Sequence, residues 1–136
     1  MQEVVPASIQ LPCARNERGR IELWEGDFLG NSLGDNVDVV LLSDVMYEES
    51  TTRIVLRNAW NGLSQNGMLV VRGCYADPER LRPIFGALFA FQALADSPQR
   101  KALTISTSEK EVRETGFRIN VVPLTEFSFV LVGRKE

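Results

Sequence analysis

The stretch VDVVLLSDVMYEE, residues 37–49, decides the fold that this sequence predicts. It begins with a nearly continuous apolar run, which is typical of a strand covered on both faces, as in a parallel sheet. Ser43 and Asp44 follow, at the point where such a strand ends. Because ligands of open α/β sheets bind beyond the carboxyl ends of the strands, this segment predicts a buried strand and one part of a binding site.

Helices and short strands alternate along the chain after this stretch. A helix is predicted over 50–64, where apolar residues recur at the spacing of one helical face. Asn66-Gly67 predicts a turn into a short strand over 68–71. A longer helix is predicted over 78–95, and its apolar surface is wide enough to indicate burial on two sides.

The C-terminal part of the chain predicts one more helix and a β-hairpin. The helix runs over 106–115 and ends at Gly116, since glycine most readily takes the left-handed conformation after a helix. Two apolar runs, 117–122 and 127–132, are close enough in sequence to pair as a hairpin. The capping box of the helix has two candidate pairs, Ser106 with Glu109 and Ser108 with Glu111.

The order of these elements indicates the fold class. A short strand is also predicted over 21–24, before a loop over 30–36 that is rich in glycine, asparagine and aspartate. Strands that alternate with helices predict an α/β domain, with a mostly parallel sheet, helices on both faces and a C-terminal antiparallel hairpin. At 136 residues the chain is long enough for a single domain, over 1–136, with its own core.

Composition excludes several classes of function. The net charge of −3 argues against a general nucleic-acid binder. The sequence contains no histidine, which excludes a Ser-His-Asp catalytic set and histidine ligands for a metal. No apolar run approaches the roughly 18 residues of a membrane span, and no signal peptide is recognised, so we expect a cytoplasmic protein. Cys13 and Cys74 are expected to be reduced thiols, with a disulfide between them as the alternative. No metal is expected, with a zinc site formed by the two cysteines and carboxylates as the alternative.

Several motifs, in this order, resemble one known family. The segments RIELWEGDFL (20–29) and IVLRNAWNGLSQNGMLVVRG (54–73) flank the opening stretch, and together they resemble the C-terminal half of class I S-adenosylmethionine-dependent methyltransferases. Within that class they are most similar to the small-molecule O-methyltransferases of secondary metabolism. The segment FGALFAFQALADSPQRKALTISTSEKEVRETGF (85–117) is similar too, so the resemblance covers about residues 20–133. It implies a partial Rossmann-like sheet from the strand order 3-2-1-4-5-7-6, S-adenosylmethionine as cofactor and methyl transfer to a small-molecule hydroxyl.

The resemblance also implies which residues bind the cofactor. Asp27 would accept a hydrogen bond from the adenine amino group, for which a carboxylate is a strong acceptor, and Phe28 would flank the adenine ring. Ser43 and Asp44 would lie near the sulfonium or the ribose. The residues alone leave other roles open: Asp27 as the cap of a turn, Phe28 as a core residue, and Asp44 as an acid at the start of a helix.

The acceptor site and the catalytic base are less well marked. The residues that the resemblance implies in acceptor binding are Met46, Tyr47, Phe85, Phe89 and Gln92. Met46 and the aromatic residues also fit a role in the core, which side chains of this kind fill more often. Many members of the family use a histidine as general base, and here Asp96 stands at the matching place and Glu48 in a neighbouring motif. Either acid is a candidate catalytic base, unless the acceptor is acidic enough to need none.

The sequence departs from the family pattern at its N-terminal side. It contains no G-x-G-x-G spacing, whose glycines let the backbone approach the cofactor, and no counterpart of the first two strands. We therefore expect a truncated catalytic domain in which strand 37–42 has an open apolar edge. Such an edge invites pairing with another chain, so we expect a homo-oligomer or a complementing N-terminal chain, unless strand 21–24 fills the gap. A non-catalytic remnant that acts as a binding or interaction module, and an unrelated α/β domain, stay open.

Overall fold

The structure is a computed structural model of the 136-residue chain. It describes residues 26–30, 32–46, 49–74, 84, 88, 91, 95, 104–125 and 128–136. In chain order the elements are β1 (Val37–Ser43), α1 (Glu49–Gly62), β2 (Leu63–Cys74), α3 (Ile105–Thr115), β3 (Arg118–Pro123) and β4 (Ser128–Arg134). The predicted strand over 21–24 lies outside the described residues.

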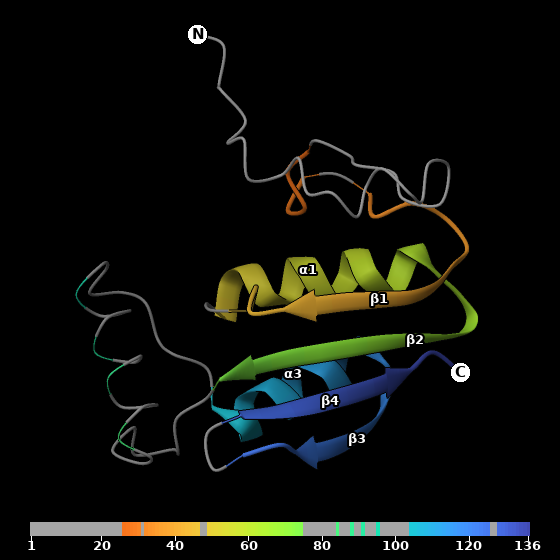
Figure 1. Ribbon diagram of the computed structural model, residues 1–136. Helices are drawn as coiled ribbons and strands as arrows, with labels where there is room; N and C mark the ends of the chain where they lie inside the picture. The colour runs from red at the N-terminus through yellow and green to blue at the C-terminus, as the bar shows by residue number, and fades with distance from the viewer. Residues whose placement is uncertain are drawn as a thin grey trace, which may run out of the picture.

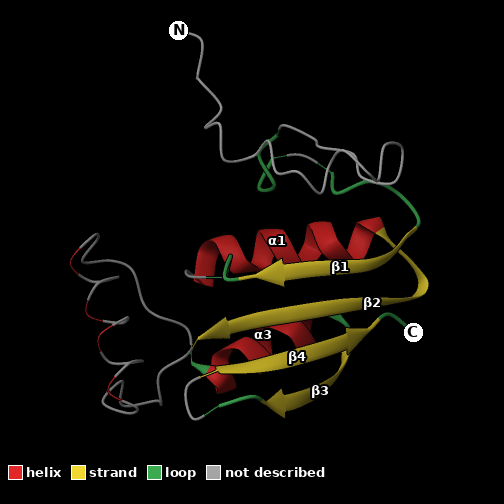
Figure 2. Ribbon diagram, in the orientation of Figure 1, coloured by secondary structure: helices red, strands yellow, loops and turns green. Residues whose placement is uncertain are grey.

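The four strands form one mixed sheet in the order β1-β2-β4-β3 (Figure 1). This order repeats the last four positions, 4-5-7-6, of the sheet that the sequence resemblance implies. β1 pairs with β2 in parallel, whereas β2 with β4 and β3 with β4 are antiparallel (Figure 2). The predicted hairpin is therefore confirmed, but within the described residues the sheet is not mostly parallel, because its C-terminal hairpin inserts β4 beside β2.

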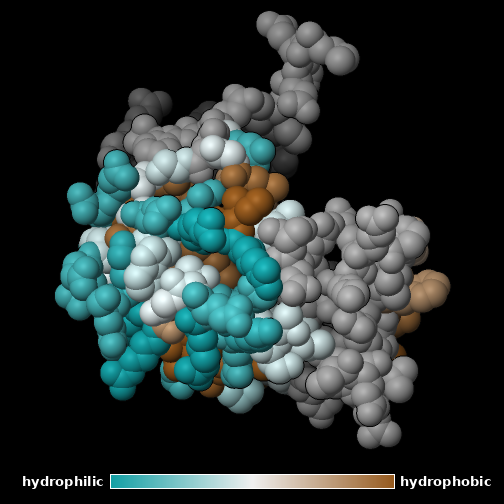
Figure 3. Space-filling view, turned by 180° about the vertical axis from the view of Figure 1, so that it is seen from behind, coloured by the Kyte–Doolittle hydropathy of each residue, from teal (hydrophilic) through white to brown (hydrophobic). Residues whose placement is uncertain are grey.

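Both described helices lie on the same face of the sheet, behind the strands in Figure 1. Strand residues alternate, and the buried ones, such as Leu69 and Leu131, point toward the helices and form the core with Val55, Leu56 and Val112. Seen from the helix side, the described surface is largely hydrophilic (Figure 3). The expected helices on both faces are thus not found among the described elements, because α1 and α3 return over the same side.

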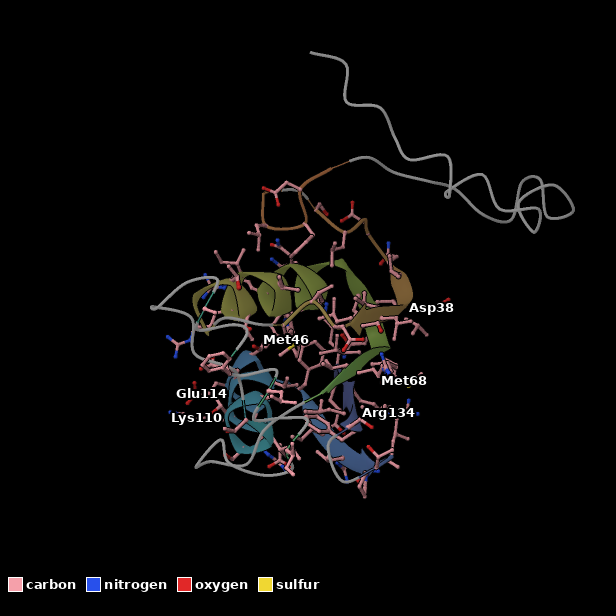
Figure 4. The ribbon with its side chains drawn as sticks, turned by 60° about the vertical axis from the view of Figure 1, so that its left-hand side comes forward. Asp38, Met46, Met68, Lys110, Glu114 and Arg134 are labelled. Carbon is pink, nitrogen blue, oxygen red and sulfur yellow. The ribbon has the colours of Figure 1, made fainter. Side chains whose placement is uncertain are left out.

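The opposite face of the sheet, here called the open face, is built from three rows of paired residues. These rows are Val39-Met68-Arg134-Arg118, Leu41-Val70-Val132-Asn120 and Ser43-Arg72-Val130-Val122. Leu41 is 64% exposed and Val39 is 47% exposed, although both stand on β1 at the edge of the sheet. Figure 4 shows Met68 beside Arg134, where the first row crosses the sheet. The described sheet thus leaves an apolar face and an apolar edge strand without cover.

The connection from α1 to β2 is less regular than the sequence suggests. The predicted turn at Asn66-Gly67 lies inside β2, and Asn66 has a φ of 66°, which asparagine tolerates better than most residues. The register of β1 with β2 changes there, from Val37 opposite Leu63 to Val39 opposite Met68. Two positions along β1 thus correspond to five along β2. The predicted turn before the strand is therefore wrong, and Asn66-Gly67 marks an irregularity within β2 instead.

The N-cap of helix α3 lies two residues before Ser106, the first of the two predicted caps. Thr104 is the N-cap, and its Oγ1 accepts a hydrogen bond from the N–H of Thr107 at 3.2 Å. Neither predicted capping pair is used, since Ser108 and Glu111 are buried within the helix. Gly116 ends the helix with a φ of 116°, as predicted from its position.

The longer predicted helix is described only at four positions. Residues 84, 88, 91 and 95 are helical. Ile84, Leu88 and Phe91 are 78%, 61% and 70% exposed, so the expected burial of this stripe is wrong for these side chains. Among the described helices, none is both long and apolar enough to cross a membrane.

An ion pair joins α1 to α3 at the edge of the core. Arg53 donates from Nε and Nη2 to the two carboxylate oxygens of Glu111, at 2.8 and 2.9 Å. Glu111 is 3% exposed, while the Arg53 side chain is 58% exposed. The hydrogen bonds from Arg53 lower the pKa of Glu111 from its ordinary value of 4.5, against the opposing effect of burial.

We predict that Glu111→Gln lowers the free energy of unfolding by roughly 1–3 kcal/mol at neutral pH, because glutamine cannot accept two charge-assisted hydrogen bonds. Since the folded-state pKa of Glu111 is depressed, its stabilisation is complete above the ordinary value and is lost as the pH falls through the folded-state pKa. The variant should lack this part of the acid sensitivity. Urea unfolding followed by circular dichroism, at neutral pH and between about pH 5 and pH 3, measures both effects.

Glu114→Gln is the matched control, because Glu114 is exposed and faces Lys110 at 3.8 Å on the same helix (Figure 4). An exposed pair of this kind contributes about 0.3–0.5 kcal/mol. Equal losses of stability in the two variants, or an unchanged acid response in Glu111→Gln, would contradict the predicted role of the ion pair.

Candidate functional site

The carboxyl ends of β1 and β2 meet at one edge of the sheet because the two strands are parallel. Ser43, the last residue of β1, is paired with Arg72. Asp44 follows in the left-handed region, with a φ of 53°, and its N–H donates to the carbonyl of Arg72 at 2.9 Å. This bond extends the strand pairing by one residue and fixes where the Asp44 side chain leaves the sheet.

The carboxylate of Asp44 forms an ion pair with Arg72. The guanidinium donates from Nη1 to Oδ2, and the hydroxyl of Ser43 lies 3.5 Å from the same oxygen. The side chains of Arg72 and Asp44 are 47% and 38% exposed, so both remain in contact with solvent. Ser43 and Asp44 stand at the end of the strand, as predicted from the sequence, but Arg72 was missed there. Its position at the end of the next strand was the available signal.

The loop that carries Asp27 and Phe28 forms a tight turn. Oδ1 of Asp27 accepts from the N–H of Leu29 at 2.9 Å, and its carbonyl accepts from the N–H of Gly30 at 3.0 Å. Within the described part of the chain, Oδ2 of Asp27 has no hydrogen bond, and Phe28 is 44% exposed. Asp27 therefore caps a turn, and it still has one oxygen for a ligand; Phe28 is not a buried core residue.

A side chain of α1 attaches this loop to the rest of the fold. Nδ2 of Asn58 donates to the carbonyl of Phe28 at 2.9 Å and reaches that of Leu29 at 3.5 Å. Leu29 and Leu33 pack against the core cluster. The backbone beside Asp27 is thus held by a polar anchor and two apolar ones, while its free carboxylate oxygen and the Phe28 ring stay accessible.

The predicted site residues do not all come together. Among the described residues, Asp27 forms hydrogen bonds only within its own loop, and Asp44 forms them with Ser43 and Arg72, so the two acids belong to separate networks. Met46 is 6% exposed and belongs to the core cluster (Figure 4), which supports the packing role. The other predicted residues, Tyr47, Glu48, Phe85, Phe89, Gln92 and Asp96, lie outside the described residues.

A groove between α1 and α3 is explained by helix packing. It is lined by Arg53, Arg57, Trp60, Asn61, Glu111, Glu114 and Thr115. The Arg53–Glu111 pair crosses it, and Trp60 packs edge-to-face on Phe117, with ring centroids 4.8 Å apart. In the part of the chain that the structure describes, no group of three or more His, Cys, Asp and Glu side chains is arranged to hold a metal ion.

Structural comparison relates this fold to known proteins. An O-methyltransferase family protein from Burkholderia thailandensis matches 91% of the chain with a TM-score of 0.79 and 21% identity. An O-methyltransferase family 2 protein from Planctomyces limnophilus, in complex with apigenin, also matches 91%, with a TM-score of 0.76 and 19% identity. Human N-acetylserotonin methyltransferase, in complex with S-adenosylmethionine, matches 82%, with a TM-score of 0.72 and 19% identity. Over most of its length, the chain has the fold of O-methyltransferase family proteins.

These matches cover only part of the other proteins. The chain spans 38%, 39% and 33% of the lengths of these three structures, in the order given above. No protein-family model and no curated protein sequence matches the chain. At such low identity the matches show the fold, and roles for individual residues depend on the geometry described above.

We predict that Asn58→Ala loosens the loop around Asp27, because it removes the side-chain donor to the Phe28 carbonyl. The loss of one such hydrogen bond should lower the free energy of unfolding by only about 0.5–1.5 kcal/mol. Exchange of the Leu29 and Gly30 amide hydrogens, measured by NMR, should become clearly faster while core amides change little.

Asn61→Ala is the matched control, since Asn61 is an exposed asparagine on the same helix and lines the groove instead. It should leave exchange at Leu29 and Gly30 unchanged. If Asn58→Ala also leaves it unchanged, then Asn58 does not anchor the loop.

Proposed function

We propose that this chain is part of an S-adenosylmethionine-dependent O-methyltransferase that methylates a hydroxyl of a small molecule. The observation that carries the proposal is the loop at Asp27-Phe28, which presents a free carboxylate oxygen beside an exposed aromatic ring. The fold supports it, and one structure with the same fold holds S-adenosylmethionine. Because the chain spans only about a third of the related structures, methyl transfer by a complete enzyme would also need the rest of that fold.

The described residues fit one end of the cofactor. Oδ2 of Asp27 can accept a hydrogen bond from an adenine amino group, and the ring of Phe28 can pack against the adenine plane. Asn58 holds the backbone directly after Phe28, so the pair is positioned before the ligand arrives. When bound, S-adenosylmethionine supplies a methyl group on a sulfonium, and the carboxylate of Asp44, although paired with Arg72, is partly exposed and could face that cation.

A second candidate function is a binding module of the same fold without catalysis. Two observations favour it: the sequence has no G-x-G-x-G spacing, and it has no histidine to act as a general base. Glu48 and Asp96 remain the proposed catalytic bases for the enzyme. The two functions differ in one measurable property, because only the enzyme needs to bind S-adenosylmethionine.

We predict that the chain binds S-adenosylhomocysteine weakly and that Asp27→Ala reduces the affinity about tenfold, the loss expected for one charged hydrogen bond. Isothermal titration calorimetry at millimolar ligand measures both affinities. Trp24 lies three residues before Asp27 in the sequence, so tryptophan fluorescence gives a second readout.

Asp35→Ala is the matched control, because Asp35 is an exposed acid in the segment that leads from the same loop to β1. It removes the same charge and should leave the affinity unchanged. Equal affinities of Asp27→Ala and the unmodified chain would remove the adenine assignment, and no binding at all would favour the module without catalysis.

We further propose that another polypeptide pairs with the edge of β1, and that a second copy does so when the chain is isolated. The two edge strands differ in chemistry. β3 carries Arg118, Asn120 and Pro123, which discourage pairing, whereas β1 presents Val39 and Leu41. A longer chain or a complementing one would take the place of the second copy in the complete enzyme.

We predict that the isolated chain is dimeric at micromolar concentration and that Leu41→Lys makes it monomeric, because the lysine would place a charge on the exposed apolar edge. Analytical ultracentrifugation measures the change. Val122→Lys is the control, since Val122 lies on the same face but on the opposite edge strand, and it should remain dimeric. A monomeric unmodified chain would rule out pairing between copies.

A further inference from the structure

The geometry points to Arg72 as the residue that binds a carboxylate on the methyl acceptor, with Asp44 as the positioning residue for its guanidinium. The acceptor class would then be small organic acids that also carry the hydroxyl. The identity of the ligand as an acceptor rests on the proposed methyltransferase function, whereas the anion site itself depends only on the residues described here.

Arg72 stands at the edge of the sheet where a ligand would bind. It is paired with Ser43 where the parallel strands β1 and β2 end, and this edge is where ligands of open α/β sheets bind. Arg72 belongs to the third row of the open face, with Val130 and Val122 beside it. A ligand there would meet a guanidinium at the strand ends and an apolar surface next to it.

Arg72 has hydrogen-bond donors beyond the one that Asp44 uses. A guanidinium carries five N–H donors in a planar fork that matches a carboxylate. The bond to Asp44 uses Nη1, and within the described residues no hydrogen bond is found for Nε or Nη2. The Arg72 side chain is 47% exposed. Arg72 can therefore hold a second carboxylate while it keeps its bond to Asp44.

Asp44 holds the guanidinium of Arg72 in place. Its N–H is bonded to the Arg72 carbonyl, and its Oδ2 lies near both the Ser43 hydroxyl and Nη1 of Arg72. The guanidinium is thus held from one side, which reduces the conformational entropy that a ligand would otherwise have to restrict. Because Asp44 and Arg72 cancel in charge, an acceptor anion and a cofactor cation would together leave the site neutral.

Two probes of matched shape test the site: 4-hydroxybenzoate, which carries a carboxylate, and 4-hydroxybenzamide, which replaces it with a neutral amide. Each is titrated into the full chain while backbone and arginine side-chain NMR signals are followed. We expect 4-hydroxybenzoate to shift the signals of Arg72 and Ser43, and to bind about tenfold or more tightly than the amide.

Variants distinguish binding by the Arg72 guanidinium from a general effect of positive charge on this face. Arg72→Gln should remove the preference for the acid, and Arg72→Lys should restore part of it, because lysine keeps the charge without the fork. Asp44→Asn should reduce the preference without abolishing it. Arg134→Gln is the matched control, since Arg134 is an exposed arginine on the same face, in the row farthest from the strand ends, and it should change nothing.

The outcomes distinguish this inference from the proposed function. Equal binding of the two probes, or an acid preference that survives Arg72→Gln in a variant whose circular dichroism is unchanged, would overturn the role of Arg72. Binding of S-adenosylhomocysteine with no acid preference leaves the proposed function intact and rejects the carboxylate site. An acid preference that depends on Arg72, without cofactor binding, supports the anion site and counts against the methyltransferase.

Discussion

The parallel pairing of β1 with β2 is the constraint on which the rest of the structure depends. It forces α1 to return the chain across one face of the sheet, and it brings Ser43 and Arg72 to the same edge. The crossing helix then supplies two further connections, Arg53 to α3 and Asn58 to the loop of Asp27. One pairing thus determines the core, the groove between the helices and both parts of the candidate site.

Two arginine and carboxylate pairs show how position decides the role of the same chemistry. Glu111 is almost fully buried, accepts two bonds from Arg53 and has a lowered pKa, so its charge is committed to joining two helices. Asp44 and Arg72 are both partly exposed at the strand ends, and their pair leaves a carboxylate oxygen and guanidinium donors open. An exposed pair contributes little to stability, so this pair could bind a ligand at the strand ends with little cost to the fold.

Local patterns predicted the elements whose residues are contiguous in sequence. The apolar run before Ser43, the helical spacing over 50–64 and the end of α3 at Gly116 were read correctly because each depends on neighbouring residues. The pair of Asp44 with Arg72 joins residues 28 positions apart and depends on strand register, which no local pattern contains. The exposure of Leu41 was hidden for a similar reason, because an apolar run looks the same whether one face or both are covered.

The two parts of the candidate site are attached to the fold independently. The loop of Asp27 is held by Asn58 in the middle of α1, whereas Asp44 is held by Arg72 at the end of β2. A ligand that contacts both must therefore bridge two separately fixed groups, and neither group needs the other to keep its geometry. Contacts to one end of a flexible, charged cofactor give weak binding, because the remaining bonds must still be ordered. Affinity for the whole cofactor thus depends on what lies between these groups, while the chemistry offered at each end is already set by α1, β1 and β2.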